Sequence, residues 1–391
     1  MRIDRFQMER TQCLYENGVE YNLSESGVQP LTPRELLDGH ELDTGGFLDL
    51  ALKYPESNGS EQLRERIALF YPGAKPDNVL VTNGGSEANY TTLWGLLDKG
   101  GRAAVMIPNY LQSWGLARAY AERADAYRLV ERREGGSRRW ALDVESLDAV
   151  VSRRTRVIVV TNPNNPTGGV LTEAEMEAII RAARRVGAWI VSDEVYRGAE
   201  ATSNVTSPTF WGRYGKAIVT AGLSKAFGMP GLRTGWIVGP APKIRDLWSY
   251  QDYTTLTPTM LSDRLARLAM EPDRRERILA RTRAIIRRNL PQVEAWIRGH
   301  GALFDYIPPL AGAIALIRYR LPIGPVALFD RLRREKSVLI TPGPHFGIGK
   351  YIRIGYGYDV GRTLAGLARV DELLAELAPG AKRRKRTATA A

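Results

Sequence analysis

The stretch Ala217-Ile-Val-Thr-Ala-Gly-Leu-Ser-Lys225-Ala-Phe-Gly-Met-Pro-Gly-Leu-Arg233-Thr-Gly-Trp236 sets one lysine and one arginine between two apolar runs. Residues 217–220 are typical of a strand, and a second apolar run starts at Gly235. Lys225 lies among Gly, Ala, Phe and Met, where an ammonium group is poorly solvated. A lysine in such surroundings can act as a nucleophile and form a Schiff base. A solvated loop lysine is the plain alternative, and segments upstream distinguish the two.

Upstream of this stretch, short apolar runs alternate with helix-like segments. The runs cover residues 79–82, 103–107, 157–160 and 189–191, and helical periodicity covers residues 60–71, 86–95 and 173–185. Continuously apolar strands that alternate with helices predict an α/β fold, with a buried, mostly parallel sheet and helices on both faces.

Residues that could bind a ligand or take part in a reaction follow the predicted strands directly. They are Gly85, Ser86, Tyr110, Asn165, Asp193, Tyr196 and Lys225. Open α/β sheets bind ligands at the carboxyl ends of their strands, so these side chains are expected to meet at one site.

The length of 391 residues favours two domains. After Gly239 the pattern changes to a polar, aromatic loop, a long basic helix and an α+β region. The irregular N-terminal segment is expected to pack with that region. The predicted division is a large domain of residues 41–285, a small domain of residues 1–40 and 286–378, and a basic disordered tail of residues 379–391.

The composition is that of a soluble globular protein, with 44% hydrophobic and 25% charged residues. No apolar run is long enough to span a bilayer, and the charged start lacks the core of a signal peptide. The one cysteine, Cys13, excludes an internal disulfide. We therefore expect a cytoplasmic protein with no membrane partner.

The formal net charge of +12 raises the question of nucleic-acid binding. Part of this charge is the run Lys-Arg-Arg-Lys-Arg at residues 382–386, which is typical of a solvated terminus. The remaining arginines are spread over helical segments. No nucleic-acid partner is predicted.

The residues after the strands suit a flat cofactor that carries a phosphate and an aldehyde. Gly85 and Ser86 open a helix whose N–H groups can hold a phosphate, and Arg233 can add a charged contact. Tyr110 can stack on a ring, or it can be an ordinary core or surface tyrosine. Asp193 would be costly to bury unless it pairs with a protonated ring nitrogen or caps a helix.

Three motifs in this order and spacing resemble the class I/II aminotransferases, which are pyridoxal-phosphate (PLP) enzymes of fold type I. The motifs are Asn162-Pro-Asn-Asn-Pro-Thr-Gly168, Asp193-Glu-Val-Tyr196 and Ser224-Lys-Ala-Phe-Gly-Met-Pro-Gly-Leu-Arg233. The resemblance covers residues 20–375. It implies a large domain with a mostly parallel sheet, a smaller α+β domain, bound PLP, no metal, and a homodimer with shared active sites.

The resemblance also implies roles for the cofactor residues. Lys225 would hold the cofactor covalently and shuttle a proton, Asp193 would pair with the pyridine nitrogen, and Asn165 and Tyr196 would bond the ring hydroxyl. The phosphate would be held by Gly85, Ser86 and Arg233, Tyr110 would stack on the ring, and Tyr54 would reach the phosphate of a neighbouring subunit.

The sequence departs from this family at Gly222, because many relatives have a phosphate-binding Ser or Thr three residues before the lysine. The phosphate would either lose that hydroxyl or recruit the one of Ser224 or Thr220. On the substrate side, Arg353 would clamp the α-carboxylate, and Gly27 would let the backbone approach closely.

Within this family the reaction stays open between two outcomes. Amino transfer from an L-amino acid to a 2-oxo acid, through an external aldimine, is the commoner. Residues 24–28, 31–36, 251–258 and 342–347 are also similar to capreomycidine synthase-like enzymes, which eliminate a hydroxyl from hydroxyarginine and close the guanidinium into a ring. Glu25 or Asp252 would then pair with a cationic side chain, and His345 would contact substrate or carry a proton; solvated loop acids and a surface or capping histidine are the alternatives.

A non-catalytic PLP-binding ligand sensor is a third interpretation. Such regulators carry a DNA-binding domain ahead of the aminotransferase-like part, and no segment of adequate length precedes residue 20 in this sequence. We therefore expect an enzyme.

Overall fold

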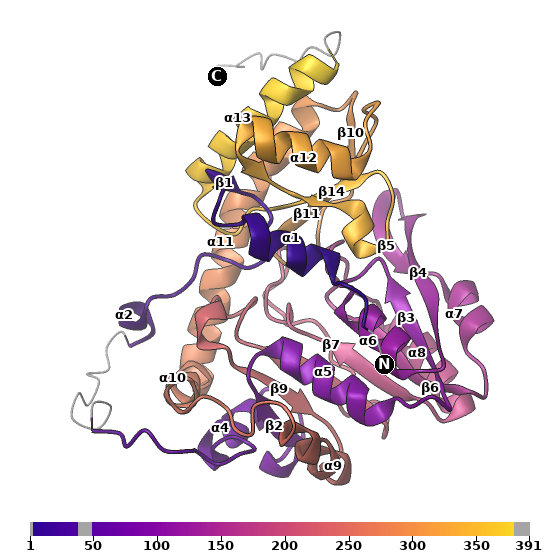
Figure 1. Cartoon of the computed structure of the whole chain (residues 1–391), viewed down its shortest axis with the longest axis vertical. Coiled ribbons are helices and arrows are strands. Elements are labelled where there is room, and N and C mark those ends of the chain that lie inside the picture. Colours follow the sequence, from indigo (N-terminus) through magenta and orange to yellow (C-terminus); the bar gives the residue numbers. More distant parts are fainter. Residues whose placement is uncertain (1–2, 38–48, 379–391) are drawn as a thin grey trace.

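The computed structural model describes residues 3–37 and 49–378. Figure 1 shows a large part built on one long sheet and a smaller part above it that holds the C-terminal helices. The large sheet has the order β2-β9-β8-β7-β6-β3-β4-β5. Its strands are β2 (Val79–Thr82), β3 (Arg102–Ile107), β4 (Arg123–Glu134), β5 (Ser137–Leu142), β6 (Thr155–Thr161), β7 (Trp189–Asp193), β8 (Ala217–Gly222) and β9 (Gly235–Val238).

The direction of these strands confirms the predicted sheet. β3 pairs in parallel with β4 and β6, β6 with β7, and β7 with β8. β9 is antiparallel to both of its neighbours, which makes β2 parallel to β8, and β5 is antiparallel to β4. The carboxyl ends of the parallel strands therefore lie along one edge.

Helices cover both faces of this sheet. They are α4 (Glu61–Ala68), α5 (Gly85–Leu96), α6 (Gln112–Tyr120), α7 (Val144–Val150), α8 (Glu173–Val186) and α9 (Ala241–Gln251). Successive residues of β3 alternate between the two faces: Val105 packs in a cluster with Leu93 of α5, whereas Met106 packs in a cluster with Ile179 of α8. A strand that is covered on both sides must be apolar throughout, which explains the continuous apolar runs of the sequence.

The smaller part is built on a second, antiparallel sheet of order β10-β11-β14-β13. Its elements are β10 (Phe304–Tyr306), β11 (Ile314–Tyr319), α12 (Pro325–Lys336), β12 (Val338–Leu339), β13 (Thr341–Pro342), β14 (Tyr351–Gly355) and α13 (Val360–Leu377). β1 (Tyr21–Asn22) pairs in parallel with β12, so the N-terminal segment lies against this part.

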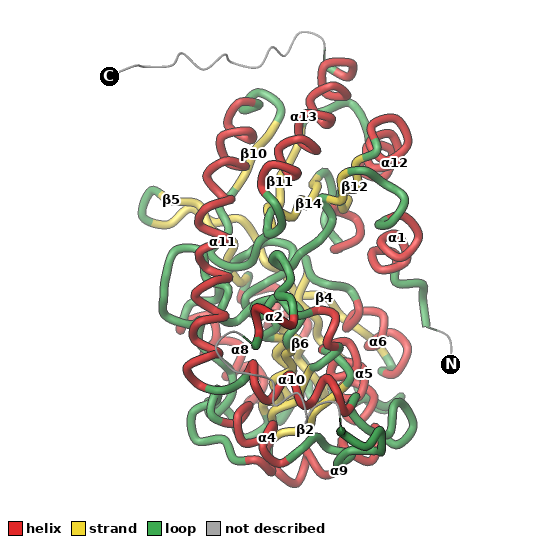
Figure 2. Tube along the Cα trace, turned by 90° about the vertical axis from the view of Figure 1, so that its left-hand side faces the viewer, coloured by secondary structure: helices red, strands yellow, loops and turns green. Residues whose placement is uncertain are grey.

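The long helix α11 (Pro272–Gly299) joins the two parts, preceded by α10 (Met260–Ala269). Figure 2 shows α11 running along one side of the molecule beside both sheets. It passes through residue 285 without a break, so the predicted domain boundary falls inside a helix. The assignment of residues to two domains stays a prediction, and the tail of residues 379–391 lies outside the described residues.

Several elements were not predicted from the sequence. The N-terminal segment, expected to be irregular, contains α1 (Gln7–Tyr15) and α2 (Pro33–Leu36). α9 continues to Gln251, into the segment whose sequence predicts a loop from residue 249. The hairpin of β4 and β5 is rich in charged residues, and only three of the six residues of β5 are buried. None of the described helices has the length and apolarity that crossing a membrane requires.

Candidate active site

A cavity of about 270 Å³ lies at the carboxyl edge of the large sheet. It brings together ten of the predicted site residues: Glu25, Gly85, Ser86, Tyr110, Asn165, Asp193, Tyr196, Ser224, Lys225 and Arg233. Nine of them end or follow β2, β3, β6, β7 and β8, whose loops all open on this edge, and Glu25 comes from the N-terminal segment after β1. The placement is the one expected for a ligand site in an open α/β sheet.

One end of the cavity has the features of an anion cradle. α5 begins at Gly85, and its N-cap, Gly84, has φ +88° and supplies no side-chain cap. A Cβ on Gly84 would lie 2.5 Å from Nη2 of Arg233, so a larger residue would displace this guanidinium. The N-terminus of α5, which carries a partial positive charge, therefore lies next to the Arg233 guanidinium. Together they favour the binding of a phosphate.

The structure explains the glycine at position 222. A Cβ there would lie 2.9 Å from the carbonyl oxygen of Thr234 and 3.1 Å from Cα of Gly235, so a hydroxyl-bearing side chain does not fit. Thr220 is not a substitute, since it is buried and donates to Oδ1 of Asn89 at 2.6 Å. Of the two candidates for this hydroxyl, only Ser224 lines the cavity.

Asp193 ends β7 and faces the cavity. Its carboxylate accepts hydrogen bonds from Nδ2 of Asn89 at 2.9 Å and from the backbone N–H of Val195 at 3.1 Å. Burial raises the pKa of Asp193, and these two hydrogen bonds and the charge of Lys225 oppose the rise. The helix-cap alternative is wrong, because the next element after Asp193 is the strand β8. A cationic partner inside the cavity would stabilise this carboxylate further.

Tyr196 and Asn165 stand on the wall of the same cavity. The hydroxyl of Tyr196 is buried and has no hydrogen-bond partner among the described residues. Asn165 accepts through Oδ1 from Nη1 of Arg353 at 3.0 Å. A buried hydroxyl without a partner is costly, so this group fits a polar ligand atom.

Arg353 lies directly behind Asn165 and is fully buried. Its Nη2 donates to the carbonyl oxygen of Ser24 and to Oγ1 of Thr341, and its Nε has no hydrogen-bond partner among the described residues. Burial lowers the pKa of this guanidinium, and Tyr196 and Glu25 oppose that. Arg353 therefore contacts the site through Asn165 and does not itself line the cavity.

Tyr110 lies against the N-terminal helix. Its hydroxyl donates to Oε1 of Glu9 at 2.8 Å, and the ring of Phe6 meets it edge-on at 4.7 Å. Burial, and next the negative charge of Glu9, raise the pKa of Tyr110 well above its ordinary value. The ring is thus held in one orientation on the cavity wall.

One face of α1 and the residue after it form a wall that sequence reasoning missed. The wall consists of Met8, Glu9, Gln12, Cys13 and Glu16. Their spacing of three and four residues places them on one side of a helix, which is a signal that the sequence does contain. Asn89, which anchors Asp193, was missed as well, because nothing in its local sequence distinguishes it from other helix residues.

Three other predicted residues do not line this cavity. Gly27 packs behind the lysine, where a Cβ would lie 3.4 Å from the carbonyl oxygen of Ser224 and 3.9 Å from Cδ of Lys225. Tyr54 is 77% exposed and lines a separate hollow with Asn83. Asp252 is an exposed residue at the end of α9.

His345 lies in η3 (Gly343–Phe346), also outside the cavity lining. Burial, assisted by the charge of Arg353, lowers the pKa of His345 to about 4. Its imidazole is therefore neutral at physiological pH. No cluster of residues able to hold a metal ion occurs within residues 3–37 and 49–378.

Comparison with known proteins places the chain in a family. The family described as Aminotransferase class I and II matches residues 49–364. Capreomycidine synthase of Streptomyces vinaceus is 30% identical, over 93% of this chain and 92% of its own. An aspartate aminotransferase of Streptomyces avermitilis is 29% identical, over 83% of this chain and 82% of its own.

Solved structures agree with this placement. A PLP-dependent aminotransferase from Streptococcus suis has a TM-score of 0.87 and 29% identity, covering 96% of this chain and 99% of its own. The PLP-dependent cyclase OrfR has a TM-score of 0.85 and 28% identity, covering 96% and 98%. The chain belongs to the class I and II aminotransferase family, has the fold type I architecture, and uses PLP as its cofactor. The helix start at Gly85, the cationic Arg233 and the unpartnered Tyr196 hydroxyl are all suited to PLP.

Proposed function

We propose that this protein is an aminotransferase that moves the amino group of an L-amino acid to a 2-oxo acid. The observation that carries this proposal is the meeting of Lys225, Asp193 and Tyr196 in one cavity of a chain from this family. Bound PLP supplies an electron sink for the bonds of the substrate Cα. The chain itself has to bind the cofactor, orient it and move protons.

The residues divide these tasks by position. N–H groups at Gly85 and Ser86, with the Arg233 guanidinium and Ser224, hold the phosphate. Asp193 holds the proton on the ring nitrogen, because its buried carboxylate is stabilised by a cation.

Three further side chains orient the ring and move the proton. Tyr196 and Asn165 hold the ring hydroxyl, and Tyr110 covers the ring. Nζ of Lys225 would accept the proton that leaves the substrate Cα and would hold it for the return transfer.

Two further roles complete the proposal. Arg353 lies behind Asn165 and outside the cavity lining, and we assign it the substrate α-carboxylate because its guanidinium already donates to Asn165 on the cavity wall and its Nε has no partner among the described residues. Tyr54 reaches the phosphate of a second copy of the chain, so the enzyme acts as a homodimer. The exposed position of Tyr54, outside the cavity of its own chain, supports this arrangement.

The test begins with purified protein and its PLP absorbance. We expect a visible band that Lys225→Ala abolishes, and formation of a new amino acid from a 2-oxo acid when suitable donors are screened. Loss of water or ammonia from the donor without any amino-acid product from the 2-oxo acid would refute amino transfer.

A specific observation favours a second candidate, elimination and ring closure on a guanidino amino acid. Glu9, Glu16 and Glu25 line one side of the cavity. Burial raises the pKa of Glu16, and the negative charges of Glu25 and Glu9 raise it further, so these carboxylates lie near one another. Such a wall attracts a cationic side chain.

The basic residues of the cavity also support this second candidate function. Among its lining residues only Lys225 and Arg233 are basic, and both have proposed roles at the cofactor. The side-chain carboxylate of a dicarboxylate substrate would meet these three carboxylates, and the described lining residues offer it no further cation. The similarity to capreomycidine synthase over most of both chains also supports this candidate.

The second candidate is tested with Glu16→Gln and Glu25→Gln. We expect each to raise the KM for a guanidino amino acid about tenfold, which is the size of one lost charge-assisted contact. The KM for an apolar amino acid should not rise. Glu20→Gln is the control, because Glu20 is outside the cavity lining. An equal KM for the guanidino substrate in all three variants would refute a cationic subsite.

A further inference from the structure

The turn that follows β7 has two sides. Asp193, Val195 and Tyr196 line the cavity, whereas Glu194 and Arg197 do not line it and are buried in the protein. Glu194 is 1% exposed and Arg197 is 9% exposed. Two charged side chains are thus buried directly behind two proposed cofactor residues, and neither lines the cavity.

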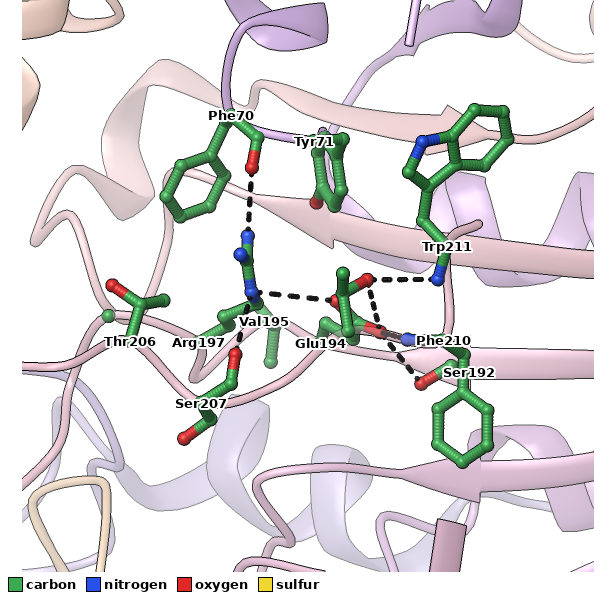
Figure 3. Close-up of polar contacts among 12 residues, drawn as sticks. Phe70, Tyr71, Ser192, Glu194, Val195, Arg197, Thr206, Ser207, Phe210 and Trp211 are labelled. Carbon is green, nitrogen blue, oxygen red and sulfur yellow. Dashed lines mark hydrogen bonds and ion pairs between the residues drawn. The ribbon is translucent and has the colours of Figure 1, made fainter. Parts of the chain in front are cut away.

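Glu194 ties the turn to a distant loop. Its Oε1 accepts hydrogen bonds from Oγ of Ser192 at 3.2 Å, Oγ1 of Thr209 at 3.0 Å and the backbone N–H of Phe210 at 2.9 Å. Its Oε2 lies 4.0 Å from Nε of Arg197 and makes no hydrogen bond among the described residues. Figure 3 shows the contacts of Glu194 with Ser192, Phe210 and Arg197.

Arg197 ties the same turn to two other segments. Its Nε donates to the carbonyl oxygen of Ser207 at 3.0 Å, and its Nη1 donates to the carbonyl oxygen of Phe70 at 3.2 Å. The guanidinium also lies over the Phe70 ring at 4.3 Å and near the Tyr71 ring at 5.3 Å, as Figure 3 shows. A planar guanidinium suits this combination of two divergent donors and a stacked face.

The segment that carries Lys225 packs against Phe70, the residue that Arg197 also contacts. The ring of Phe227, two residues after Lys225, meets the Phe70 ring at 6.1 Å. The backbone N–H of Ala226 donates to the carbonyl oxygen of Val195 at 3.4 Å, and that of Glu194 to Thr220 at 2.8 Å. Arg197 therefore contacts, directly or through Phe70, both segments that face the cofactor.

We propose that Glu194 and Arg197 are positioning residues that hold Asp193, Tyr196 and Lys225 in register around PLP. Neither touches the cavity, so their effect passes through the backbone of the turn and through Phe70. Sites of this kind need supporting residues that fix the first contacts to a fraction of an ångström. The proposal depends on the PLP site and not on which reaction the enzyme catalyses.

The test uses the absorbance of bound PLP and its rate of dissociation, which need no knowledge of the substrate. In Arg197→Lys the charge stays but the two divergent donors and the stacked face are lost. We expect the pH midpoint of the PLP band to shift and PLP affinity to fall about tenfold or more, as for other supporting contacts. Glu194→Ala should behave in the same way, and Glu194→Gln, which keeps an acceptor for the three hydrogen bonds, should restore most of the affinity.

The matched control is Glu175→Ala. Glu175 is also a buried carboxylate, bonded to Arg139 and to the N–H of Leu142, but it lies outside the cavity wall. This variant should lower Tm and leave the PLP midpoint unchanged. The proposal is overturned if Arg197→Lys has the midpoint and affinity of the wild type. It is equally overturned if Glu194→Ala and Glu175→Ala change only Tm. If Glu194→Ala does not fold, Arg197→Lys decides.

Discussion

Asp193 and Glu194 are neighbouring carboxylates with different surroundings. Asp193 faces the cofactor site and accepts two hydrogen bonds. Glu194 faces the interior, where burial raises its pKa from the ordinary 4.5 to about 7, although Arg197 and three hydrogen bonds oppose this. Burial also raises the pKa of Asp193, but its two hydrogen bonds and the charge of Lys225 oppose the rise, whereas Glu194 titrates inside the fold near neutral pH.

Glu194 should make the stability of the protein depend on pH. Its folded pKa is raised, so the folded state binds the proton more tightly and loses stability as pH rises from 4.5 through about 7. The whole effect is about 3 kcal/mol, at about 1.4 kcal/mol for each tenfold change in proton affinity. Glu194→Gln lacks this titration, so its stability relative to the wild type should increase over that range. Urea unfolding at pH 5 and pH 8 measures the difference, and a constant difference would contradict it.

At this scale the sequence predicted the groups that meet at the strand ends, including Lys225 and Asp193. Their spacing after apolar runs is a local property, so it can be read without coordinates. The reason for a glycine at position 222 could not be predicted in this way. A side chain there would crowd Thr234, which is twelve residues away in the sequence. Likewise, nothing local to Thr220 shows that its hydroxyl is taken by Asn89.

At the scale of elements, α1 contributes four cavity-lining residues that the sequence did not predict. Only Met8 of this helix is buried, so the apolar periodicity of α1 is too weak to predict a helix from the sequence. Its functional face is polar instead, with Glu9, Gln12 and Cys13 turned toward the cavity. Strong strands such as β6 and β8 were predicted because burial on both faces requires apolar residues throughout.

Cys13 offers a direct test of where α1 lies. It is exposed, lines the cavity and is the only cysteine, so one mass shift reports its modification. Adding PLP at ten times its Kd to the apoprotein should slow maleimide labelling of Cys13 about tenfold, because only the free site reacts. The control is the double variant Cys13→Ser with Leu14→Cys, since Leu14 is exposed and outside the cavity lining. Equal protection of both thiols would show that α1 does not face the site.

At the scale of the whole molecule, the charged β4–β5 hairpin joins the two sheets. Arg138 of β5 donates to Asp305 of β10 at 2.5 Å and to Glu131 of β4 at 2.6 Å. Tyr351 of β14 donates to Glu131 at 2.6 Å, and Arg318 of β11 also pairs with Asp305. Because these strands are rich in charged residues, a search for apolar runs does not detect them. The same charged residues connect the hairpin to the smaller part. Contacts between segments so far apart in the chain leave no local pattern.

The ion pairs of Asp305 with Arg138 and Arg318 should stabilise the contact between the two parts at neutral pH but not at strongly acidic pH. The side chains of Arg138 and Arg318 hold the pKa of Asp305 well below its ordinary 3.8, so its stabilising effect is present at neutral pH and is lost as pH falls below that value. Asp305→Asn should therefore cost about 1 kcal/mol at pH 7, an estimate kept small because the arginines are partly exposed. The cost should begin to shrink below pH 3.8 and should approach zero only below the much lower folded pKa of Asp305, as measured by urea unfolding at pH 7 and at a series of acidic pH values. Glu335→Gln, which breaks an exposed pair with Arg331 on a single helix, should cost less at pH 7. A cost for Asp305→Asn that is independent of pH would mean that packing, and not charge, holds the hairpin to the smaller sheet.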